Sequence, residues 1–180
     1  MRLQSLNHLI EVVRAVAQPR RLQILRSASP LPRHPELDVP GGALERTTEA
    51  DSLLDPSNES SAESLQFAAG RDSAFMSQNA YYADIPRPVI PETLRAGWES
   101  RLHPVSGCDN VFALDPYDLA IVELRVGREK DLDLLRAMLR LKIVEPEPLR
   151  RHYQQTPLGE REAFAAGRNL TLVLRETSPT

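Results

Sequence analysis

The stretch that decides the fold reads LDPYDLAIVELRVGREKDLDLLRAML and covers residues 114–139. Asp115 is a good N-cap, and Pro116 suits the first helical position because its φ is already helical and its missing N–H would be unpaired there. Apolar residues follow at helical spacing until Gly127, and a second helix is predicted to begin within Arg128–Asp131. The stretch therefore predicts two helices that meet at Gly127 and bring charged groups together at one corner.

Length and composition limit the class of protein around this pair of helices. The chain has 180 residues, which is enough for one domain with a real core. Its net charge of −3 provides no overall basic field, so there is no strong signal for DNA binding. The one cysteine, Cys108, excludes an intrachain disulfide and a zinc site built on cysteines, and it fits a reducing, cytoplasmic setting.

The first residues do not resemble a secretory signal. Arg2 is basic, but Asn7, His8, Glu11 and Arg14 interrupt any apolar segment of the kind that a signal peptide needs. No uninterrupted apolar run reaches the length that spans a membrane. The sequence therefore predicts a cytoplasmic protein with no membrane partner.

The rest of the chain predicts a mixture of short strands and helices. Apolar spacing predicts a helix over the first seventeen or so residues, and the prolines and glycines between Pro30 and Gly42 predict a loop. Strands are predicted at Arg20–Arg26, Glu45–Asp51, Ser73–Ala83, Trp98–Val105, Val111–Leu114 and Leu170–Leu174. Further helices are predicted at Glu63–Ala69, at Pro146–Tyr153, and from Thr156 to about Gly167.

This order predicts an α+β fold, in which a small mixed β-sheet is flanked by helices and the C-terminal part is helical. We expect residues 1–154 to form one domain. We expect residues 155–180 to form a short helix and a C-terminal tail that packs on this domain or extends from it.

A pair of carboxylates is the first candidate for a functional site. Glu49 and Asp51 are two residues apart in a predicted strand, so their side chains point to the same face. Two such carboxylates can hold Mg²⁺ and orient a nucleoside triphosphate. The same spacing recurs elsewhere in the chain, however, and on spacing alone a solvated strand face is the better interpretation.

The turn after the first predicted strand is the second candidate. A small, hydroxyl-bearing turn at this place can offer backbone N–H groups to a phosphate, and Ser27 lies in it. Arg26 stands where close approach of a phosphate to the backbone would favour glycine, and Pro30 follows soon after. Taken alone, this segment is an ordinary turn.

The corner between the two helices is the third candidate. Arg128 and Lys130 can hold phosphates, and Asp131 can act as a base or fix the arginine. An ion pair at the surface of a helix N-terminus explains the same residues without any chemistry, and it is the better interpretation when the corner is considered alone.

Several stretches taken together change these interpretations. The pattern of Leu114–Ala120 that leads to Gly127–Asp131 is fairly specific, and further stretches support it in the same order along the chain. These are Glu49–Asp51, Ala80–Ala83, Ile90–Leu94 and Ala96–Leu102. Together they resemble a family of uncharacterised bacterial proteins described as minimal nucleotidyltransferase-like, which is distantly similar to the abortive-infection nucleotidyltransferase toxins.

The resemblance implies a small mixed sheet with a Gly-Ser turn after the first strand and a metal-binding carboxylate pair on a neighbouring strand. By this resemblance Ser27 and Arg26 fall at the nucleotide-binding turn, and Glu49 and Asp51 fall at the Mg²⁺ site. Arg128, Lys130 and Asp131 fall at the catalytic helical cluster. The expected partners are a nucleoside triphosphate, an RNA or protein acceptor, and a partner protein in a toxin–antitoxin or defence setting.

Two departures from the family pattern point toward a degenerate site. The glycine of the turn is replaced by Arg26. A basic residue expected in the first helix of the pair is replaced by Glu123, which reverses the local charge. Two hypotheses follow: metal-dependent transfer of a nucleotide, or an inactive nucleotidyltransferase-like module for binding or regulation. Glu123 is predicted to face the same region as Glu49 and Asp51.

Overall fold

The computed structural model describes residues 1–18, 20–26, 28–55, 59–84 and 94–177. Its strands are β1 (Arg21–Ile24), β2 (Glu49–Asp55), β3 (Tyr82–Asp84), β4 (His103–Pro104) and β5 (Val111–Ala113). Its helices are α1 (Leu3–Ala17), α2 (Glu59–Ala69), α3 (Ala74–Asn79), α5 (Pro116–Val126), α6 (Glu129–Arg140), α7 (Pro146–Gln155) and α8 (Glu160–Thr177). Three short 3₁₀-helices are η1 (Pro35–Leu37), η2 (Ala43–Arg46) and η3 (Trp98–Arg101).

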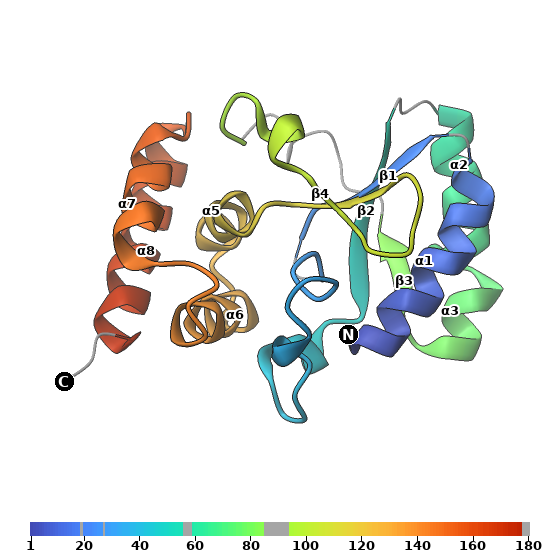
Figure 1. The fold of residues 1–180 in the computed structure, drawn as a ribbon, viewed down its shortest axis with the longest axis horizontal. Coiled ribbons are helices and arrows are strands. Elements are labelled where there is room, and N and C mark those ends of the chain that lie inside the picture. Colours follow the sequence, from blue (N-terminus) through green and yellow to red (C-terminus); the bar gives the residue numbers. More distant parts are fainter. Residues whose placement is uncertain (19, 27, 56–58, 85–93, 178–180) are drawn as a thin grey trace.

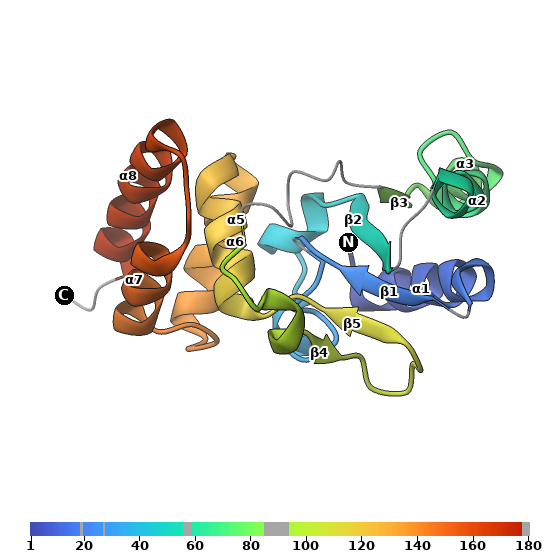
Figure 2. The ribbon, with the colours of Figure 1, turned by 90° about the horizontal axis from the view of Figure 1, so that it is seen from above.

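These elements form an α+β structure with three regions along its longest axis. Figure 1 shows the sheet in the middle, α1, α2 and α3 at one end, and α5 to α8 at the other end. Figure 2 shows the same separation from above. The predicted class, a mixed sheet with helices and a helical C-terminal region, is therefore confirmed. The expected domain boundary at residue 154 stays a prediction.

The sheet has five strands in the order β3-β2-β1-β5-β4. The central strand β1 is antiparallel to β2 and parallel to β5, while β3 is parallel to β2 and β4 is antiparallel to β5. Leu22 and Ile24 on one face of β1 and Gln23 on the other are all buried, as a central strand covered on both faces requires. The carboxyl ends of β1 and β5 therefore meet the start of β2 at one edge, directly before α5 begins.

The two helices predicted on either side of Gly127 form as α5 and α6. The Asp115 side chain accepts a hydrogen bond from the backbone N–H of Tyr117, so it caps α5. Gly127 ends α5 with a φ of 66°, and a Cβ there would lie 2.3 Å from Nδ2 of Asn169. Because Asn169 itself donates to the carbonyl of Leu124, only glycine leaves room for α8 to pack closely at this turn.

Several predicted strands are wrong, and the segment that forms the end of α8 is the clearest case. Leu170–Leu174 was predicted as a strand, but it lies inside an 18-residue helix. The helix also continues through Gly167, where a Cβ would be 2.8 Å from the hydroxyl of Tyr153. Leu170, Val173 and Leu174 are buried where α8 packs on α5 and α6, so tertiary packing overrides the β-like composition of this segment.

The segment from residue 73 to residue 83 and the segment from residue 98 to residue 105 are also not continuous strands. The Ser73 side chain accepts from the N–H of Met76 and caps the short helix α3, and only Tyr82–Asp84 pairs with β2. Trp98–Arg101 is 3₁₀-helical before the two-residue strand β4. The strand predicted at Glu45–Asp51 begins later, at Glu49, because η2 occupies the preceding residues.

Candidate functional site

The candidate site lies at the edge where β1 and β2 meet α5 and α6. Glu49 and Asp51 lie at the start of β2, and Asp84 of β3 is paired in register with Asp51. Residues paired across neighbouring strands, and residues two apart on one strand, direct their side chains to the same face. The sheet therefore gathers three carboxylates at one place, two of which the sequence predicted.

The guanidinium of Arg26 is the centre of a cluster that we call the Arg26 cluster, made of Arg26, Asp51, Glu123 and Asp131. Its Nη2 donates to Oε2 of Glu123 at 3.3 Å and lies 3.9 Å from Oδ1 of Asp131. Its Nη1 lies 3.8 Å from Oδ1 of Asp51. One side chain from the turn after β1 thus joins a strand and two helices.

Glu123 is completely buried and points toward this cluster from α5. The structure thereby confirms the prediction that Glu123 faces the same region as Asp51. It also shows that the two departures from the family pattern, Arg26 and Glu123, contact each other directly. The negative charge of Glu123 is therefore paired with the positive charge of Arg26.

The charged residues at the start of α6 are also satisfied within the protein. Asp131 accepts from the backbone N–H of Arg128 at 3.1 Å and from its Nε and Nη2 at 2.8 and 3.0 Å. It is fully buried and caps the helix N-terminus. Lys130 donates from Nζ to Oε1 of Glu49 at 3.0 Å. The structure therefore brings these predicted site residues together as ion pairs.

The environment of Asp51 in this cluster disfavours its charged form. Burial raises the pKa of Asp51 to about 6; Arg26 counteracts this rise, and the neighbouring charges of Asp84 and Glu49 add to it. The pKa of Glu49 moves the other way. Although burial opposes ionisation there, the hydrogen bond and charge of Lys130 outweigh it and lower the pKa.

These contacts decide whether the residues fit the Mg²⁺ that the resemblance implies. Mg²⁺ needs near-octahedral oxygen ligands with free lone pairs, but Arg26 lies beside Asp51 and Lys130 binds Glu49. Across the described ranges, no group of three or more histidine, cysteine, aspartate or glutamate side chains is arranged to hold a metal ion. As the side chains are placed, the site does not fit Mg²⁺.

The predicted phosphate turn is only partly described. Ser27, which was predicted to contact a phosphate, lies outside the described residues. Of the residues on either side of it, Ser29 donates its backbone N–H to the carbonyl of Arg26 at 2.6 Å. Nε of Arg26 and Oγ of Ser29 are buried without a hydrogen-bond partner among the described residues.

The sequence did not reveal a second buried charged group, which we call the Asp118 network and which consists of Asp118, Arg101 and His152. Asp118 on α5 accepts from Nε and Nη2 of Arg101 at 2.8 and 2.9 Å, and Nε2 of His152 on α7 lies 2.7 Å from its Oδ1. Burial opposes ionisation, but these two partners outweigh it and lower the pKa of Asp118. Its place in the first turn of a helix was the only local signal.

Asp84 was also missed, because its segment was predicted as one long strand that ended at Ala83. The signal that could have found it is an acidic residue two positions after the aromatic pair Tyr81 and Tyr82, in a segment that could pair with the strand carrying Glu49 and Asp51. Only the register of β3 against β2 shows that Asp84 and Asp51 are paired.

Comparison with protein-family models, with curated proteins and with solved structures gave no match. The family resemblance therefore rests on the sequence motifs alone. Among the helices that the structure describes, none is both long and apolar enough to cross a membrane.

Proposed function

We propose that this protein is a nucleotidyltransferase-like module that acts through binding and regulation and does not transfer nucleotides. The observation that carries the proposal is the position of the Arg26 guanidinium, which contacts Asp51, Glu123 and Asp131 at once. A guanidinium keeps its charge throughout the pH range of a folded protein. These three carboxylates therefore always have the Arg26 guanidinium as a cation beside them, whereas a metal-dependent enzyme needs carboxylate oxygens that are free to bind the metal ion.

The predicted catalytic residues support the same proposal. A general base must come within hydrogen-bonding reach of the proton that it takes. Asp131 is fully buried, and both of its carboxylate oxygens bind Arg128 as the cap of α6. Its role is to begin the helix, and Arg128 and Lys130 are likewise held by acidic partners of the same chain.

The second candidate is the metal-dependent nucleotidyl transfer that the resemblance implies. The convergence of Asp84 with Glu49 and Asp51 favours it, since three carboxylates on one sheet face exceed what a structural ion pair requires. This candidate demands that Arg26 and Lys130 both leave their present partners. The proposal and this alternative therefore make opposite predictions for nucleotide binding.

The test is incubation of the protein with labelled nucleoside triphosphates, Mg²⁺ and candidate RNA or protein acceptors, together with a thermal-shift titration. A ligand at one hundred times its Kd stabilises the folded state by about 2.7 kcal/mol, which is readily measured. We expect no transfer, and no Mg²⁺-dependent shift at millimolar nucleotide. Transfer that is lost in Asp51→Ala would overturn the proposal in favour of the transferase.

A variant that restores the family pattern supplies the positive control. In Arg26→Gly with Glu123→Lys, the internal cation is removed and a cation stands at position 123. We expect this double variant to gain a stabilising shift with nucleotide and Mg²⁺ that the wild-type protein lacks. The single variant Glu123→Gln, which keeps Arg26 in place, should show no such gain.

A further inference from the structure

The outward face of α8 carries an exposed stripe of alternating arginine and apolar side chains. Successive members are three or four residues apart, so all of them lie on one side of the helix. The stripe consists of Arg161, Phe164, Arg168, Leu172 and Arg175, and all five are exposed. Phe164 is 77% exposed, which is unusual for so large an apolar side chain. The stripe faces away from α5 and α6, on which the other side of α8 packs.

The charged members of this stripe are not used within the chain. Other charged residues of α8 form ion pairs with neighbouring helices: Glu162 with Arg125 and Glu176 with Arg136. Arg161, Arg168 and Arg175 make no such pair with any residue that the structure describes. The stripe therefore presents unbalanced positive charge beside exposed apolar surface.

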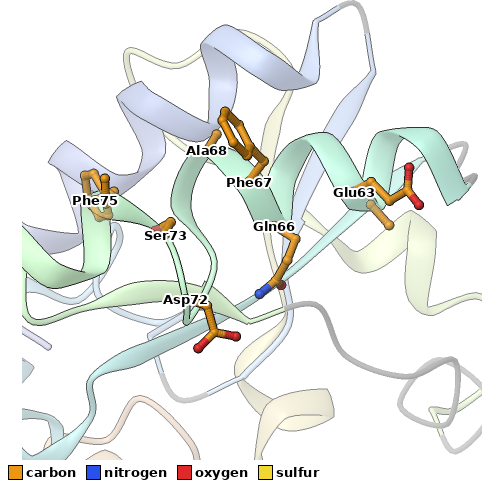
Figure 3. Close-up of a pocket in the computed structure, with 9 residues that line it drawn as sticks. Glu63, Gln66, Phe67, Ala68, Asp72, Ser73 and Phe75 are labelled. Atoms are coloured by element: carbon orange, nitrogen blue, oxygen red, sulfur yellow. The ribbon is translucent and has the colours of Figure 1, made fainter.

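The opposite end of the molecule carries a surface of complementary character. A groove of about 800 Å³ lies over α2 and the start of α3, and Phe67 and Phe75 supply its aromatic side chains. Phe67 is 88% exposed, and Val16 of α1 extends the apolar surface on its far side. Figure 3 shows Phe67 and Phe75 together with the carboxylates of Glu63 and Asp72, which lie apart from each other. No lysine or arginine lines the described groove.

We propose that the α8 stripe of one copy of this chain docks into the α2–α3 groove of a second copy. Phe164 and Leu172 bury against Phe67 and Phe75, while the stripe's arginines meet Glu63 and Asp72. Aromatic and arginine side chains are the residues that most often dominate the binding energy of protein interfaces. This proposal does not depend on nucleotide binding, because neither surface includes a residue of the Arg26 cluster.

The charges determine how the two copies are arranged. Two α8 stripes placed against each other would oppose arginine to arginine, and two grooves would oppose acid to acid, which costs free energy at any interface. The favourable contact is therefore heterologous, with different surfaces on the two copies. Since α8 and α2 lie at opposite ends of the long axis (Figure 1), the contact leaves one stripe and one groove free, and chains or rings can grow.

The experiment is sedimentation velocity of the full chain over a range of concentrations, with Phe164→Asp and Phe67→Asp compared to the wild type. We expect the wild type to form species larger than a dimer as its concentration rises, and each variant to stay monomeric. Val39→Asp, which also replaces an exposed apolar residue but lies in neither surface, is the matched control and should behave as the wild type does. All of these residues are exposed, so folding should be unaffected, and circular dichroism verifies this.

Mixing the two variants separates this proposal from other modes of association. Phe164→Asp keeps an intact groove and Phe67→Asp keeps an intact stripe, so an equimolar mixture should form a one-to-one dimer and nothing larger. This dimer should weaken by at least tenfold when the salt concentration rises from 0.05 to about 0.5 M, because screening acts on the arginine–carboxylate pairs. A monomeric wild type at millimolar concentration, or association that survives Phe67→Asp, overturns the proposal.

Discussion

The Arg26 cluster and the Asp118 network are both buried arginine–carboxylate groups on α5, yet they differ in how well they are satisfied. Arg101 and His152 bind Asp118 at 2.7–2.9 Å, whereas Arg26 contacts its three carboxylates at 3.3–3.9 Å. The pKa of Asp118 is lowered, while burial raises that of Asp51 to about 6. The Asp118 network therefore stabilises the packing of α5 and α7. The Arg26 cluster holds Asp51 in an environment that disfavours its charge, which lowers the stability of the folded state at neutral pH.

The difference indicates where each group acts in the molecule. The Asp118 network joins η3, α5 and α7, and it behaves as a structural lock because each partner is hydrogen-bonded to the same carboxylate. In the Arg26 cluster, three carboxylates share one guanidinium whose Nε has no partner among the described residues. A buried arginine with an unsatisfied donor is typical of a site retained for a reason other than stability.

The largest predicted effect comes from the Asp118 network. Asp118→Asn removes the charge that holds Arg101 and His152, and it should lower the free energy of unfolding by about 3–5 kcal/mol, as the loss of one member of a buried ion pair does. Chemical denaturation measures this change. Glu147→Gln on α7, which removes an exposed pair with Arg150, is the control and should cost less than about 1 kcal/mol. A small cost at Asp118 would contradict its role as a lock.

The next prediction concerns the central cation of the Arg26 cluster. Arg26→Met removes the guanidinium that contacts Asp51, Glu123 and Asp131, and it should destabilise the protein by about 2–3 kcal/mol at pH 7. Arg46→Met, which removes an exposed ion pair with Asp133, serves as the matched control. If Arg26 compensates Asp51, the double variant with Asp51→Asn should cost less than the sum of the single variants. Strict additivity would show that the two residues act independently.

The third prediction is that Asp51→Asn and Asp118→Asn change the free energy of unfolding in opposite directions. Folding raises the pKa of Asp51 from 3.8 to about 6, so the folded state binds more protons than the unfolded state between these values, and stability falls as the pH rises through this range. Asp51→Asn should therefore stabilise the protein by about 1–2 kcal/mol at pH 7.5, and this gain should shrink as the pH falls below 6 and vanish below 3.8, the pKa of the unfolded chain. The same substitution at Asp118 destabilises.

Denaturation curves at several pH values test this contrast. For Asp118 the lowered pKa reverses the sign, since its stabilising charge is present above the pKa of the unfolded chain and is lost as the pH falls through the folded value. Asp55→Asn, on the same strand as Asp51 but exposed, is the control and should change stability little at any pH. If Asp51→Asn were destabilising at pH 7.5, the charge of Asp51 would stabilise the fold as that of Asp118 does, and the proposed difference between the Arg26 cluster and the Asp118 network would be wrong.

The smallest effect is expected at the edge of the cluster. Lys130 and Glu49 keep 19% and 18% of their side-chain surface exposed, so solvent screens their pairing. A double-mutant cycle with Lys130→Met and Glu49→Gln should give a coupling free energy of about 0.5–1 kcal/mol. A coupling free energy above about 2 kcal/mol would show that Lys130 and Glu49 interact as strongly as a buried ion pair and belong to the Arg26 cluster.

The sequence predicted the elements whose signals are local, and it failed where tertiary contacts decide. Asp115, Pro116 and Gly127 define the boundaries of α5 through their own backbone chemistry, and all three have the predicted roles. The apolar run at 170–174 and the aromatic residues between 73 and 83 were assigned to strands because short apolar runs have no clear period. Ser73, which caps α3, was the local signal that could have corrected the second assignment.

The candidate site was predicted as a list of residues but not as an arrangement. Glu49, Asp51, Arg128, Lys130 and Asp131 do come together, and Glu123 faces them. What the sequence left out is that Arg26 lies between them and that Asp84 joins them. Both facts depend on the register of β1, β2 and β3 and on the docking of α5, which no local pattern contains.

The sequence by itself determined the α+β fold class and the pair of helices joined at Gly127. It also identified most of the charged residues of the candidate site. Capping, glycine φ and apolar spacing act within a few residues, so they can be recognised along the chain. Only the tertiary structure decided that Arg26 pairs with Glu123 and that Asp118 is held by Arg101 and His152. It also decided that α8 leaves an arginine stripe exposed. These outcomes depend on burial and on contacts between residues far apart in the sequence, which set the free energy of each charge.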